Sequence, residues 1–101
     1  MGNEYKYFNR KELRKHVIKL LEERGVTIRD ISLIAKQAQE KYSPHLTIED
    51  YDESVYNILG KREVQNAIMT GIELDKAAEE NRISDPYLLS MIREEDGLYG
   101  Q

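Results

Sequence analysis

The chain has 101 residues, a net charge of −4 and no cysteine. This length fits one domain, and the lack of thiols excludes disulfides, thiolate metal sites and a cysteine nucleophile. The negative charge argues against general nucleic-acid binding, because neutralising phosphates requires a surplus of Lys and Arg. No apolar run approaches the roughly 18 residues of a membrane span. We therefore expect a single cytoplasmic helical domain over residues 1–101, with residues 1–8 as a flexible arm.

The starts of three helices are marked by a side-chain cap with an acidic partner three residues later, which is the capping-box pattern or close to it. The three pairs are Asn9 with Glu12, Thr27 with Asp30, and Thr47 with Asp50. Each start also has an apolar pair in the positions of a hydrophobic staple. These pairs are Phe8 with Leu13, Val26 with Ile31, and Leu46 with Tyr51. A fourth cap, Asp85, precedes Pro86, and proline is favoured at the first helical position.

Five helices follow from these starts and from glycine or proline at the stops. In chain order they are predicted at 10–24, 28–42, 48–59, 61–80 and 86–97. No segment alternates polar and apolar residues over a useful length, so we expect an all-α fold of about five helices in a compact bundle. The positions predicted to be buried recur at helical spacing. They are Leu13, Val17, Leu20, Leu21, Ile31, Ile34, Ala35, Ala38, Tyr51, Val55, Ile58, Leu59, Val64, Ala67, Ile68, Ile72, Leu74, Ala78, Leu88, Leu89 and Ile92.

Two residues of the fourth helix stand out. Asp75 falls on the apolar stripe, where a carboxylate must be hydrogen-bonded, paired or functional. A satisfied structural acid is favoured there over a catalytic or metal-binding one. Gly71 lies inside the helix at a cost of about 1 kcal/mol relative to alanine, and close approach of another helix would explain it.

Clusters of charge offer two weaker sites. Glu94, Glu95 and Asp96 could hold a divalent cation through oxygen ligands, although a solvated acidic end is favoured. The first helix carries a basic set that could meet an anionic membrane surface or an acidic partner, although pairing with the chain's own acidic body is favoured. This set is Lys11, Arg14, Lys15 and Lys19. His16 and His45 are too isolated to form a metal site, and no catalytic residue can be assigned.

Four ordered stretches resemble the phosphatidylglycerophosphatase A-like family, in its soluble all-helical branch from Bacillus-type bacteria. The stretches are residues 61–75 (KREVQNAIMTGIELD), 21–27 (LEERGVT), 41–47 (KYSPHLT) and 95–100 (EDGLYG). The resemblance implies the N-terminal part of a Mg²⁺-dependent phosphoric monoester hydrolase acting on phosphatidylglycerophosphate. In that family an Asp-Glu pair follows the Leu-Tyr-Gly element and an Asp-Asp pair lies further on, and both are missing here.

Without these acids, Mg²⁺ would lack the ligands that metal-assisted hydrolysis requires. We therefore expect a chain that is inactive alone and holds no cofactor. It is either a fragment of a longer hydrolase or a short relative that kept the scaffold as a protein-interaction or regulatory module. Either reading leaves apolar surface on the fourth and fifth helices, which a homo-oligomer or a protein partner would cover. Gly71, Leu98 and Tyr99 are the expected interface residues.

Overall fold

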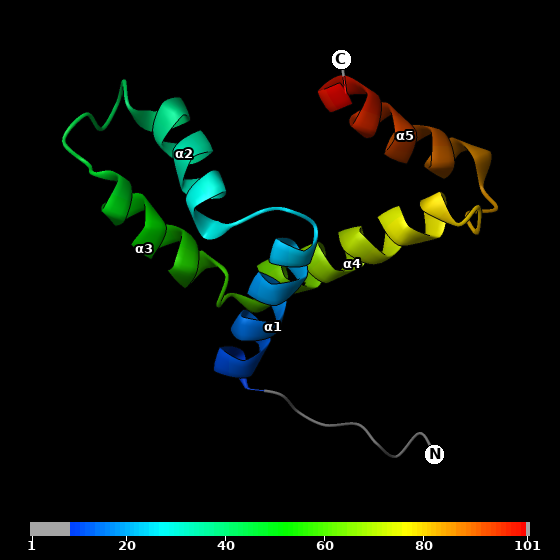
Figure 1. The fold of residues 1–101 in the computed structure, drawn as a ribbon, viewed down its shortest axis with the longest axis horizontal. Coiled ribbons are helices and arrows are strands. Elements are labelled where there is room, and N and C mark those ends of the chain that lie inside the picture. The colour runs from blue at the N-terminus through cyan, green and yellow to red at the C-terminus, as the bar shows by residue number, and fades with distance from the viewer. Residues whose placement is uncertain (1–8, 101) are drawn as a thin grey trace. The chain divides into compact units, whose positions relative to one another are not determined.

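The structure, a computed structural model, describes residues 9–100, except for the side chains of Arg10 and of residues 95–100. The predicted arm, residues 1–8, lies outside this range. Five helices and no strand are present within 9–100, which confirms the all-α prediction (Figure 1). In chain order the helices are α1 (Arg10–Glu23), α2 (Ile28–Gln39), α3 (Ile48–Ile58), α4 (Arg62–Glu79) and α5 (Pro86–Gly100). None of them combines the length and hydrophobicity that crossing a bilayer requires.

The predicted caps form as hydrogen bonds. The backbone N–H of Glu12 donates to Asn9 Oδ1 over 2.8 Å at the start of α1. Thr27 and Asp30 form a reciprocal capping box at α2, and Thr47 and Asp50 form another at α3. At α5 the backbone N–H of Tyr87 donates to Asp85 Oδ1 over 2.8 Å. Each cap satisfies backbone donors that the first helical turn leaves without a partner.

Two helices are followed by a residue in the left-handed backbone conformation. Gly25 has φ +84° after α1, where Val26 N donates to Leu21 O over 2.9 Å. Asn81 has φ +58° after α4, where Arg82 N donates to Ala77 O over 2.8 Å. Both are Schellman-type ends, and glycine or asparagine tolerates the left-handed conformation best. The helix α2 ends at Gln39, three residues before its predicted end, while α5 continues three residues beyond its predicted end at Gly97.

The chain divides into two compact units, one up to Asn66 and one from Ala67 onward. The first unit has a core of apolar side chains from α1 and α3, namely Val17, Tyr51, Val55 and Leu59. It also buries two polar side chains, Ser32 and Gln65, completely or nearly so. Gln65 Nε2 donates to Leu59 O over 3.0 Å, which satisfies a carbonyl at the end of α3. The second unit buries Ile72, Ala78 and Ile92.

Several burial predictions are wrong. Ile34 is 69% exposed and Ile58 is 43% exposed, and Ala38, Ala67 and Leu88 are also exposed. In α2 the buried position is Ser32, which the apolar pattern does not indicate. The helix is therefore turned about its axis, so that only part of its apolar stripe faces α3. Among the described residues no helix closely approaches Gly71, because this glycine is exposed and a Cβ atom built on it would meet nothing within 4 Å.

Candidate functional site

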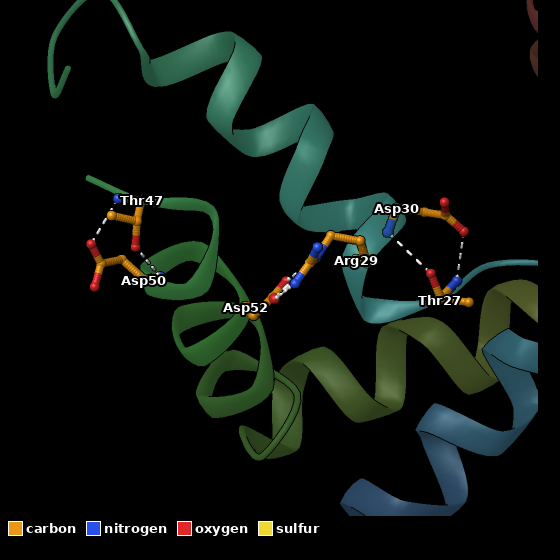
Figure 2. Close-up of polar contacts among 6 residues, drawn as sticks. All are labelled: Thr27, Arg29, Asp30, Thr47, Asp50 and Asp52. Atoms are coloured by element: carbon orange, nitrogen blue, oxygen red, sulfur yellow. Dashed lines mark hydrogen bonds and ion pairs between the residues drawn. The ribbon is translucent and has the colours of Figure 1, made fainter. Parts of the chain in front are cut away.

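The best-defined polar site of the first unit joins α2 to α3. Arg29 of α2 and Asp52 of α3 form an ion pair that Figure 2 shows between the two helices. Arg29 Nη2 donates to Asp52 Oδ2 over 2.7 Å, and Arg29 Nε donates to the same oxygen over 3.0 Å. Two nitrogens of the guanidinium are thus committed to one carboxylate. This geometry fixes the relative orientation of the two side chains as well as the distance between them.

The capping boxes hold the starts of the same two helices (Figure 2). At α2 the backbone N–H of Thr27 donates to Asp30 Oδ2 over 2.9 Å, and Asp30 N donates back to Thr27 Oγ1 over 3.1 Å. At α3 the matching distances between Thr47 and Asp50 are 2.8 and 3.1 Å. The local sequence therefore positions α2 and α3 at their starts, and the Arg29–Asp52 pair ties them together.

The three carboxylates of this region are held in the charged form. The backbone N–H of Thr27 lowers the pKa of Asp30, with the Thr27 hydroxyl contributing less. The backbone N–H of Thr47 lowers the pKa of Asp50 in the same way. For Asp52 the main cause of a lowered pKa is the hydrogen bond from Arg29, whose own pKa is raised in return. A general acid near neutral pH needs a raised pKa, so these carboxyl groups are not poised to donate a proton.

A second contact in the first unit occupies one of the predicted basic residues. The guanidinium of Arg14 lies over the ring of Tyr56, 4.3 Å from its centroid, a cation–π contact between α1 and α3. Its far end also fills the space beside Gly60, where a Cβ atom would overlap the guanidinium. Arg14 is half-buried as a result. Its charge is directed into this contact and away from the basic surface that the sequence suggested.

The other basic residues of α1 stay on the surface. Lys11, Lys15 and Lys19 are exposed, and within the described residues none of them forms an ion pair with the acidic body. Three exposed acids lie on the same helix, one among these lysines and two after them. These acids are Glu12, Glu22 and Glu23. Among the described exposed side chains of α1, these three lysines and three glutamates balance in charge, and this weakens the case for attraction to anionic lipid.

The remaining candidate site residues do not form a common site among the side chains that the structure describes. Asp75 is half-buried and is not without an interaction partner. Glu94 is exposed, whereas the side chains of Glu95, Asp96, Leu98 and Tyr99 lie outside the described residues. Among the side chains that the structure describes, no three acids or histidines lie close enough to hold a metal ion. His16 and His45 are both exposed.

The outward side of α2 is the feature that the sequence did not predict. We call it the α2 outer face and define it by Leu33, Ile34, Gln37 and Ala38. Leu33 is 53% exposed and Ile34 is 69% exposed. The opposite side of α2 packs against α3, the helix that contacts it most in the described part of the chain. Apolar residues around most of the circumference of α2 were the available signal, because such a helix is normally covered on both sides.

The fold and this site define a small all-α protein whose ordered polar contacts fix a helix pair. No protein-family model matches the chain. It is 48% identical to the uncharacterized protein YutG of Bacillus subtilis over 79% of its own length and 48% of YutG. It is 40% identical to the uncharacterized protein YpjQ of the same bacterium, over 80% of this chain and 45% of YpjQ. The chain thus spans about half the length of the curated relatives it matches.

Solved structures show the same fold. The crystal structure of YpjQ, described with the family DUF64, matches with a TM-score of 0.78 and 35% identity over 92% of this chain and 57% of YpjQ. A protein of unknown function from Bacillus stearothermophilus matches at 0.71 and 49% identity, over 87% and 56%. The low temperature requirement C protein of Listeria monocytogenes matches at 0.72 and 42% identity, over 87% and 55%.

These comparisons correct the resemblance stated from the sequence. The matched proteins are uncharacterized or are described with DUF64, and none is named as a phosphatidylglycerophosphatase. The assignment to the phosphatidylglycerophosphatase A-like family is therefore wrong.

Proposed function

We propose that the chain is a non-catalytic helical module, acting in the cytoplasm, that binds another protein through the α2 outer face. The observation that carries this proposal is the exposure of Leu33 and Ile34 on a helix whose other side is already packed against α3. Large apolar side chains gathered on an exposed surface are typical of protein-binding sites.

The contacts below this face support the proposal. The capping boxes order the starts of α2 and α3, the two helices pack against each other, and the Arg29–Asp52 pair joins them. A surface that is already ordered loses less conformational entropy when a partner binds, so its contacts contribute more to affinity. Arg29 and Asp52 are committed to each other, which is consistent with a supporting role for this pair beneath the binding surface.

The experiment measures binding of the chain to two immobilised probes, full-length YutG and a second copy of the chain. Binding to at least one probe is expected, and Leu33→Glu with Ile34→Glu should abolish it because both charges would have to be buried. Met91→Glu is the matched control, since Met91 is a 65% exposed apolar residue of α5. No binding to either probe, or binding that the α2 variant leaves intact, would overturn the proposal.

A further inference from the structure

The charges at the two ends of the α2 outer face have opposite sign. Asp30 lies near the start of α2, and Lys41 follows its end, where Glu40 still has helical backbone angles of φ −57° and ψ −37°. The two residues are eleven positions apart, which is close to three helical turns of about 3.6 residues each. They therefore lie on the same side of the helix axis, one at each end of the apolar residues.

Both charges are accessible. Asp30 and Lys41 are exposed. The capping box uses Asp30 Oδ2 to accept from Thr27 N, and leaves Oδ1 available to another partner. Within the described residues Lys41 forms no ion pair. The lowered pKa of Asp30 keeps its carboxylate negative at neutral pH.

We infer that the partner of the α2 outer face is a second copy of this chain, with the two α2 helices antiparallel about a two-fold axis. This inference rests on the proposed function and names its partner. Antiparallel pairing places residue 30 of one copy opposite residue 41 of the other, so that Asp30 meets Lys41 at both ends. A two-fold interface repeats each contact, and one favourable pair thus becomes two.

The side chains between the charges suit the same register. Leu33 is placed across from Ala38 of the second copy, so a large side chain faces a small one. Ile34 is placed across from Gln37, and the aliphatic part of Gln37 can cover it. Alternating large and small residues let two helices approach closely. The area buried by one pair of helices lies at the small end of the range for stable interfaces. The fraction of dimer therefore depends on protein concentration.

The test exchanges the charges separately. Asp30→Lys places like charges opposite each other in a homodimer, and so does Lys41→Asp, so each variant alone should sediment as a monomer. An equimolar mixture restores opposite charges at both ends, and it should sediment as a heterodimer at concentrations where the unmodified chain is dimeric. Ile34→Glu should weaken self-association about tenfold or more, and Met91→Glu should leave it unchanged. Circular dichroism of each variant confirms that helix is retained.

The outcomes separate this inference from the proposed function. Monomers in both single variants and a dimer in their mixture support the antiparallel pairing. A mixture that stays monomeric while the unmodified chain dimerises overturns the register. A chain that is monomeric at all concentrations, but binds YutG through the α2 outer face, overturns the inference and leaves the proposed function standing.

Discussion

The two units of the chain use their helices differently. In the first unit α2 and α3 pack side by side, and the core below them contains Val17, Tyr51, Val55 and Leu59. In the second unit α4 and α5 do not pack against each other to a comparable extent within the described residues. There, Arg93 Nη2 in the middle of α5 donates to Oδ1 of Asn81, just after the end of α4, over 3.4 Å.

This difference decides which exposed apolar residues can form a binding surface. Tyr87 and Met91 of α5 are at least as exposed as Leu33 of α2. However, α2 is fixed by a packed neighbour, whereas α5 has fewer contacts that would hold it in place. A helix stabilised mainly by its own hydrogen bonds opens more readily than one docked on a core. Exposure of apolar residues alone therefore does not identify the binding surface. The packing of the helix that carries them against a neighbouring helix is also needed.

The largest effect is expected from truncating the core of the first unit. Leu59 is 3% exposed, so Leu59→Ala should lower the free energy of unfolding by about 2–4 kcal/mol through lost burial and a cavity. The neighbouring Ile58 is 43% exposed, and Ile58→Ala should cost much less. Urea unfolding followed by circular dichroism measures both. Equal losses at the two positions would show that the first unit lacks the core assigned to it.

Removing a cap should have the next largest effect. Thr47→Ala deletes the hydroxyl that accepts from Asp50 N and should cost about 1 kcal/mol. Because α2 and α3 pack together, faster amide hydrogen exchange is expected in both helices. Asp85→Ala deletes the cap of α5, and its effect should stay within α5. Exchange that increases only in α3 after Thr47→Ala would mean that the two helices open independently.

The sequence predicts the helix starts well because a cap depends on residues three positions apart. Two residues are enough to predict each start, Thr27 with Asp30 for α2 and Thr47 with Asp50 for α3. Both capping boxes form in the structure. Burial in α2 is predicted poorly because it depends on which side of the helix meets α3. The apolar pattern favours Ile34, yet Ser32 is buried instead.

The site depends on contacts that leave no local pattern. Arg29 and Asp52 are 23 positions apart and pair only after α2 and α3 have packed. Arg14 reaches Tyr56 across α1 and α3, and the sequence alone placed its charge on the surface. The α2 outer face follows from the rotation of α2 against α3. The sequence shows that α2 is apolar around most of its circumference, but which side stays exposed is decided by this packing.

Acid should weaken the first unit through its three low-pKa carboxyls. The pKa values of Asp30, Asp50 and Asp52 lie below their ordinary value in the folded chain. Their contribution to stability is therefore complete above about pH 4. It is lost as the pH falls through the lowered folded values, because the unfolded state binds more protons there. Urea midpoints should fall over this window. The combined variant Asp30→Asn, Asp50→Asn and Asp52→Asn should show a flatter dependence, and an unchanged slope would refute these assignments.

The smallest effect is expected from the ion pair between α2 and α3. Both partners are partly exposed, and such pairs contribute little because water and salt screen them. Arg29→Ala and Asp52→Ala should each lower the urea midpoint less than Thr47→Ala does. A double-mutant cycle should give a favourable coupling that shrinks in about 1 M salt, where the screening length falls to about 3 Å. The pair of Lys36 and Glu40 lies within the end of α2, so Lys36→Ala is the control that leaves the junction between the helices intact. Coupling of Arg29 and Asp52 that persists in high salt would show that this junction is held by packing and not by charge.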